Sequence, residues 1–160
     1  MVVSKEKDGL VTLYMKYYVE RVLAEYEKHS KVEEVATPAP LHLFDLDKTQ
    51  GQWSTSEAAV FHTTTARLLL LCPRARSGVQ LPARCMCTGV QQPLTGEKNK
   101  LDRSVGVRKK TGTRRRRWCG AGKEKKLREY VDASCAPSPR WKRTSGGGYN
   151  MGRHMYSQHL

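Results

Sequence analysis

Apolar side chains recur at steps of three and four residues between Met15 and Lys28. The apolar positions of this stretch are Met15, Tyr18, Val19, Val22, Leu23 and Tyr26, and charged side chains separate them. This period is typical of an α-helix with one buried face. Residues 10–13, just before it, have the character of an extended segment. The pattern therefore predicts a short extended start that leads directly into a helix.

Weaker apolar patterns predict three further helices downstream. One begins at Ser56, whose hydroxyl is suited to capping, and Pro73 is expected to end it. Another covers residues 77–87, with Pro82 interrupting it, and the last covers residues 97–109. We expect about four helices in total.

The stretch between the first two predicted helices lacks a regular pattern. Prolines at 38 and 40 and the glycine at 51 argue against a helix or a strand there. We therefore interpret residues 30–55 as a linker.

The pattern changes to alternation near the end of the chain. Residues 127–131 alternate as a strand does, and residues 144–151 and 154–157 predict two more strands, joined near Gly152-Arg153. The order is helices first and strands last. The predicted fold class is α+β, with about four helices followed by an incomplete antiparallel β-sheet of two to four strands.

Charge adds a functional expectation to this fold. The chain has 29 Lys and Arg against 15 Asp and Glu, a formal net charge of +14. Residues 1–60 hold 7 basic and 10 acidic side chains, whereas residues 61–160 hold 22 basic and 5 acidic ones. A field of this sign attracts the phosphates of nucleic acids or an anionic membrane surface, and the apolar pattern described below does not favour a membrane. The predicted partner is therefore nucleic acid, bound without sequence preference.

Four segments of this region are basic, and two of them include a tryptophan; together such cations and rings neutralise phosphates and stack on bases. The candidate nucleic-acid-binding residues are Arg108, Lys109, Lys110, Arg114, Arg115, Arg116, Arg117, Trp118, Lys123, Lys125, Lys126, Arg140, Trp141, Lys142 and Arg143. No zinc-finger, RNA-recognition or helix-turn-helix signature accompanies them.

Cysteine spacing and hydropathy exclude other classes. The five cysteines are an odd number, so reduced thiols are expected, and Cys85-Met86-Cys87 has one intervening residue and no second pair at zinc-finger spacing. The short apolar run 68–72 is far from the roughly 20 residues of a membrane span. The N-terminus lacks the apolar core of a secretory signal. We expect an intracellular protein of the cytoplasm or nucleus, with no membrane and no small-molecule substrate as partner.

Short motifs follow one another in a distinctive order along the chain. They are Phe61-His62, Ala66–Cys72, Arg74–Gln80, Lys100–Arg103, Gly112-Thr113, Tyr130–Ser134, Thr144–Gly147, Met151-Gly152 and Tyr156-Ser157. This order resembles the Pol polyprotein of copia-type long-terminal-repeat retrotransposons, in the region after the reverse transcriptase palm. Val11–Met15 and Thr37–Ala39 are similar to the same family. The resemblance covers almost the whole chain.

The resemblance implies two parts. Residues 1–113 would be a helical remnant of the reverse transcriptase thumb and connection, with the linker at about 30–55. Residues 114–160 would be the truncated first strands of a ribonuclease H fold. Because such strands would lack their neighbours and covering helices, we expect the C-terminal third to be partly disordered.

The same resemblance places Asp132 at the first acid of the ribonuclease H site, where the intact family holds two Mg²⁺ ions between several carboxylates. From Ala133 to Leu160 there is no Asp or Glu, and the polymerase motif Tyr-x-Asp-Asp is absent from the chain. The nearest acidic pair, Asp45 and Asp47, lacks the neighbours of that motif. We expect a degenerate, inactive remnant that holds no cofactor, with Asp132 inactive.

Two other interpretations remain open. The chain is alternatively a small stand-alone basic nucleic-acid-binding protein, or a translation without a selected function.

Overall fold

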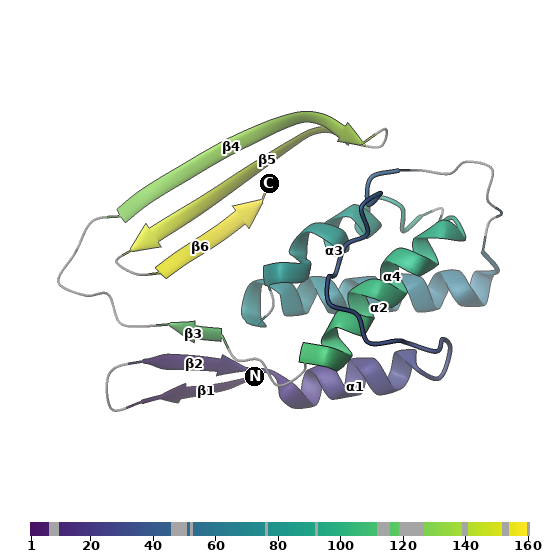
Figure 1. Cartoon of the computed structure of the whole chain (residues 1–160), viewed down its shortest axis with the longest axis horizontal. Helices are drawn as coiled ribbons and strands as arrows, with labels where there is room; N and C mark the ends of the chain where they lie inside the picture. Colours follow the sequence, from purple (N-terminus) through teal and green to yellow (C-terminus); the bar gives the residue numbers. More distant parts are fainter. Residues whose placement is uncertain are drawn as a thin grey trace. The chain divides into compact units, whose positions relative to one another are not determined.

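The computed structural model of the chain describes residues 1–6, 10–45, 51, 53–75, 77–91, 93–111, 116–118, 127–138, 141–151 and 154–159. These ranges contain four α-helices, one 3₁₀ turn and six strands (Figure 1). In chain order they are β1 (Val2–Lys5), β2 (Val11–Tyr14), α1 (Lys16–Tyr26), α2 (Thr55–Ala75), η1 (Ser77–Val79), α3 (Gln80–Cys87), α4 (Gly96–Thr111), β3 (Arg116–Trp118), β4 (Leu127–Ser138), β5 (Trp141–Met151) and β6 (His154–His159). The α+β class predicted from the sequence is confirmed.

The chain divides into two compact units. The helical unit spans Met15–Arg114, and the strand unit combines Met1–Tyr14 with Arg115–Leu160. The family resemblance implied a division between residues 113 and 114, which would group the first fourteen residues with the helices. Because β2 pairs with β3, the structure instead groups them with the later strands.

The strand unit holds two antiparallel three-stranded sheets, in the orders β1-β2-β3 and β4-β5-β6. In the first, Val11, Thr12 and Leu13 of β2 lie opposite Trp118, Arg117 and Arg116 of β3. In the second, β4 and β5 pair from Leu127↔Met151 to Ser138↔Trp141, with a register shift between Cys135 and Ser138. The predicted strands near 127, 144 and 154 thus form one meander.

Helix α2 begins with a capping box that the sequence prediction misplaced. Ser54 Oγ accepts from the Glu57 backbone N–H at 3.4 Å, and the Ser54 N–H donates to Glu57 Oε2 at 3.2 Å. The cap is therefore Ser54, and the prediction of Ser56 was wrong. The reciprocal bonds of Ser and a Glu three residues later satisfy two N–H groups that the first turn leaves open.

Two prolines lie inside helices rather than at their ends. Pro73 is within α2, which continues to Ala75, so the prediction that it ends the helix was wrong. Pro82 is the third residue of α3, where a backbone N–H has no intrahelical acceptor to lose. The interruption predicted at Pro82 falls instead between η1 and α3, at Val79.

The four helices enclose one hydrophobic core. Its fully buried centre includes Phe61 and Leu68 of α2, Met86 of α3, and Leu101 and Val105 of α4. The indole of Trp53 packs edge-on against the Phe61 ring, with centroids 5.2 Å apart. The apolar period of α1 is also explained, because Val19, Val22 and Tyr26 are its buried residues.

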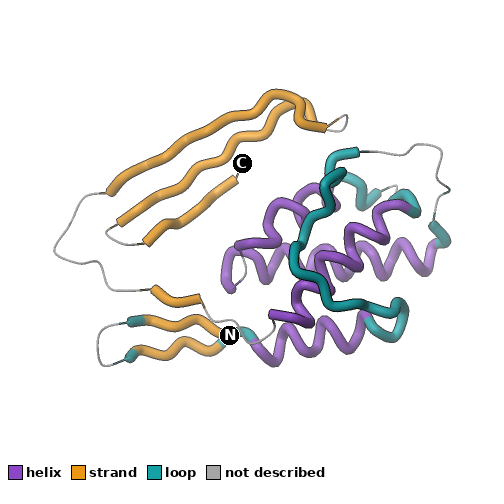
Figure 2. Tube along the Cα trace, viewed as in Figure 1, coloured by secondary structure: helices purple, strands orange, loops and turns teal. Residues whose placement is uncertain are grey.

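Residues 31–45, here called the strap, follow α1 and pack along α4 (Figure 2). The strap holds no helix or strand, and its carbonyls instead accept hydrogen bonds from side chains. The donors are Lys100 to Asp45 O at 2.9 Å, Arg103 to Thr37 O at 3.1 Å, Ser104 to Pro38 O at 3.2 Å, Lys109 to Val32 O at 3.4 Å, and Cys85 to Leu43 O at 3.4 Å. The segment interpreted as a linker is therefore fastened to the core over this length.

Gly106 makes the close approach of the strap to α4 possible. A Cβ atom at this position would overlap the carbonyl oxygen of Glu33 and lie 3.2 Å from Val35 Cγ2. Because backbone cannot move aside as the end of a flexible side chain does, only glycine fits while the strap stays in place.

Gly106→Ala is expected to destabilise the helical unit by about 1–3 kcal/mol, as overpacking does. In an unobstructed helix the same change would stabilise by up to about 1 kcal/mol, so the sign is diagnostic. Urea unfolding followed by circular dichroism measures it. Gly78→Ala is the control, because nothing lies within 4 Å of a Cβ at that position. A Gly106→Ala protein as stable as the wild type would contradict the packing described.

Candidate nucleic-acid interface

The three candidate residues on α4 have different environments. Arg108 is only 2% exposed, which places its guanidinium in the interior of the helical unit. Lys109 donates to Glu27 Oε1 at 2.9 Å, and this carboxylate raises the pKa of the lysine. Lys110 is exposed. Of the three, Lys110 alone is an exposed cation without a carboxylate partner among the residues that the structure describes.

Arg108 has an internal electrostatic role instead. Burial raises the pKa of the Cys72 thiol to about 11, and the Arg108 guanidinium lowers it in part. Burial likewise raises the pKa of Cys87 to about 11. These thiols therefore stay protonated at neutral pH, which suits packing rather than nucleophilic chemistry.

Other cations of the helical unit are also engaged within it. Arg67 forms an ion pair with Glu25, and Lys16 lies 3.6 Å from Glu20. Lys100 and Arg103 donate to the strap, as described above. Much of the positive charge of α1, α2 and α4 thus has a structural partner nearby.

Apart from Arg114, the other candidate residues belong to the strand unit, and two of its strands carry basic and aromatic residues together. Arg116, Arg117 and Trp118 make up β3, in the first sheet. Trp141, Lys142 and Arg143 begin β5, the central strand of the second sheet. The strand unit as a whole has 13 basic and 5 acidic residues in its 60 positions, a net charge of +8. Arg114, Arg115, Lys123, Lys125, Lys126 and Arg140 lie outside the described residues.

Asp132 lies in the middle of β4, opposite Gly146 of β5. No group of three potential metal ligands occurs among the residues whose placement is described. A site for two Mg²⁺ ions needs several carboxylates around the pair. The sequence has no Asp or Glu between Ala133 and Leu160.

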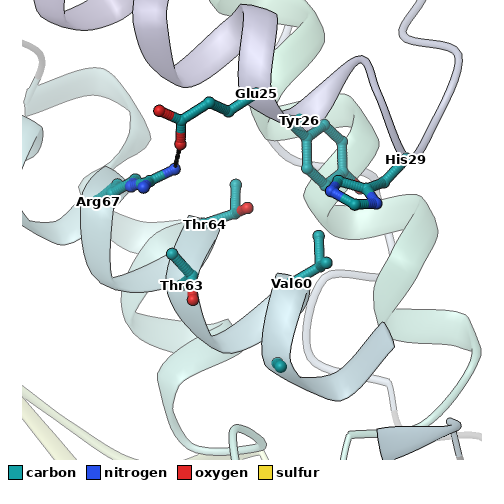
Figure 3. A pocket seen from close by; sticks show the side chains of 8 residues that line it. Glu25, Tyr26, His29, Val60, Thr63, Thr64 and Arg67 are labelled. Carbon is teal, nitrogen blue, oxygen red and sulfur yellow. Dashed lines mark hydrogen bonds and ion pairs between the residues drawn. The ribbon is translucent and has the colours of Figure 1, made fainter. Parts of the chain in front are cut away.

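A cavity of about 230 Å³ between α1 and α2 was not foreseen from the sequence (Figure 3). It is lined by Glu25, Tyr26, His29, Ala59, Val60, Thr63, Thr64 and Arg67. The Glu25–Arg67 ion pair borders it, and these two charges neutralise each other (Figure 3). The cavity joins residues about forty positions apart, which no local pattern in the sequence signals.

A hydrogen-bonded cluster beside this cavity ties α1 to α4. Tyr26 donates its hydroxyl to Asp102 Oδ1 at 2.7 Å, and Ser30 donates to the same oxygen at 2.9 Å. Burial, then the hydrogen bond to Asp102, raise the pKa of the Tyr26 phenol far above its ordinary value of 10.0. The cluster satisfies a polar tip on a tyrosine that is otherwise part of the core.

No protein-family model, curated protein or solved structure matches this chain. Within the described residues, none of the helices has the length and apolar character needed to cross a membrane.

The raised pKa of the Tyr26 phenol predicts that the folded chain loses stability in alkali. Its folded-state pKa is raised above the unfolded value, so its contribution is complete below about pH 10 and falls as the pH rises further. Tyr26→Phe should cost about 1 kcal/mol at neutral pH through the lost hydrogen bond. The difference in unfolding free energy between wild type and variant should then shrink above about pH 10.

Urea unfolding at a series of pH values measures this difference. Tyr17→Phe is the matched control, because Tyr17 is 77% exposed and its variant should track the wild type at every pH. A Tyr26→Phe difference that is independent of pH would refute the role given to the buried phenol.

Proposed function

We propose that this chain is a catalytically inactive remnant of a copia-type reverse transcriptase and ribonuclease H polyprotein, whose strand unit binds nucleic acid without sequence preference. The observation that carries the binding proposal is the difference in net charge per residue between the two units. The strand unit has a net charge of +8 in 60 residues, and the helical unit has +6 in 100 residues.

The basic side chains of the two units also differ in the partners available to them. In the helical unit, Arg67 and Lys109 pair with carboxylates and Arg103 holds the strap. In the strand unit, the segment from Ala133 to Leu160 has four cations and no acid in its sequence. A phosphate backbone that binds a basic segment releases its condensed counterions, which supplies affinity without reading bases.

Basic and aromatic residues on one strand suit single-stranded nucleic acid. Cations neutralise the backbone while rings stack on exposed bases, and stacking tolerates any base. The segments Arg116–Trp118 and Trp141–Arg143 each combine these residue types within three positions. We therefore expect single strands to bind at least as well as duplex DNA.

The order of motifs supports the polyprotein origin, and the fold is compatible with it. A helical unit precedes three antiparallel strands, and the first of these strands contains Asp132. The compartment in this proposal is the cytoplasm or nucleus, where nucleic acid is the partner and neither a membrane nor a small-molecule substrate is required.

The salt dependence of binding tests which unit is responsible. The double variants Arg116→Gln/Arg117→Gln and Lys142→Gln/Arg143→Gln should each reduce the slope of log affinity against log salt by roughly 1.4 to 1.8, because each lost phosphate contact removes about 0.7 to 0.9. Fluorescence anisotropy with a labelled single-stranded oligonucleotide gives the slope.

Lys28→Gln/Lys31→Gln is the matched control, since it removes the same charge from exposed positions of the helical unit. It should leave the slope nearly unchanged. If the control lowers the slope as much as the strand variants do, binding is not located in the strand unit. A strong preference for one sequence would instead favour a dedicated binding protein.

Catalysis is tested separately, with a labelled RNA–DNA hybrid and Mg²⁺ or Mn²⁺. We expect hydrolysis at background only, since Asp132 lacks partner carboxylates downstream. Hydrolysis that disappears in Asp132→Asn would prove the remnant active and require acids in other parts of the chain.

A further inference from the structure

Strand β4 has an open edge. It is an outer strand of its sheet, hydrogen-bonded to β5 on one side (Figure 1). Among the residues that the structure describes, no strand pairs with its other side. β4 also contains Pro137, and proline is tolerated in edge strands because it has no N–H to donate. An unpaired row of backbone groups along a strand of this length is a template for another strand.

In its first half, β4 has two neighbouring side chains that are exposed. Tyr130 is 50% exposed and Val131 is 73% exposed. Neighbouring residues in a strand point to opposite faces, so one of these side chains lies on each face of the sheet. Native proteins usually protect such an edge with lysines, a bulge or a covering element. The register shift of β4 lies further along, after Cys135, and leaves 127–133 regular.

We infer that this edge pairs with the same edge of a second copy of the chain. Two identical edges pair antiparallel about a two-fold axis perpendicular to the sheet, which preserves the face of every residue. The axis must therefore lie midway between the two copies of one residue, which pairs with itself. When that residue is Tyr130, residues 127–133 of the two copies pair, and Arg128 of each copy lies opposite Asp132 of the other.

Charge selects this register over its neighbours. A centre at residue 128, 129 or 132 places Arg128, Glu129 or Asp132 opposite its own copy, which is destabilising for like charges. A centre at 131 or 133 forms no cross-strand ion pair. The centre at Tyr130 gives two opposite-charge pairs and one aromatic pair, the kinds of cross-strand contact that stabilise sheets. The strand is thus self-complementary in one register.

This self-association is independent of the proposed nucleic-acid binding, and a charge swap tests it. The full chain, freed of nucleic acid by nuclease, is studied by sedimentation velocity at about 0.15 M salt. The wild type should form a reversible dimer. Arg128→Asp and Asp132→Arg alone should each raise the dimer dissociation constant about tenfold or more, because both ion pairs become repulsive.

Combining the two changes should restore the dissociation constant to within about threefold of wild type, since the swapped charges again attract. Glu129→Arg is the matched control for Asp132→Arg: it alters the net charge equally but lies opposite Val131. It should change the dissociation constant by less than about threefold. A double variant no tighter than the single ones would overturn the register.

Hydrogen exchange of the wild type keeps the inference falsifiable if a variant fails to fold. Amides of residues 127–133 should gain protection as protein concentration rises, in parallel with dimer formation, while those of β6 should not. A wild-type chain that stays monomeric up to about 1 mM would overturn the inference altogether, as would a dimer in which β4 gains no protection.

Discussion

The approach of the strap to α4 at Gly106 governs the organisation of the helical unit. Carbonyl groups of an irregular segment need donors, and α4 supplies them from three cationic side chains and one hydroxyl along its length. The missing side chain at Gly106 lets the strap come close enough for those bonds to form. The strap in turn carries the buried Val32 and Leu43, which extends the core beyond the four helices.

This arrangement has a consequence for the charge of the molecule. Lys100, Arg103 and Lys109 are committed to carbonyl or carboxylate partners, and Arg108 is buried. A helix that is strongly basic in sequence therefore contributes less to an external field than its composition suggests. The strand unit has the higher density of net charge. Its strand β3 consists of basic and aromatic residues, and its strand β5 begins with them. The proposed binding activity follows from that contrast.

The features that the sequence predicted well are those with a local signal. The period of apolar residues from Met15 locates α1, and the alternation after Leu127 locates β4. Strand β3 has only three residues and β1 four, too few for a period to show, and the pairing of β3 with β2 joins residues about a hundred positions apart. The capping box at Ser54 did have a signal, since a Glu follows three residues later.

The candidate site divides in the same way. A run of basic residues reports charge but not burial, so the sequence grouped Arg108 with Lys110 although α4 buries one and exposes the other. The strap contacts and the cavity beside Tyr26 depend on residues far apart in the chain, which composition and spacing do not encode. The alternating pattern ended the predicted strand at Val131, whereas β4 continues through Asp132 to Ser138; the role of Asp132 stays a prediction.

Hydrogen exchange of the full chain, with and without a short single-stranded oligonucleotide, tests the location of binding most directly. The account predicts added protection in β3 and in the first half of β5, with amides of α4 and the strap unchanged. Protection confined to α4 and the helical unit would contradict it, because the cations there would then be binding phosphate rather than holding the fold together.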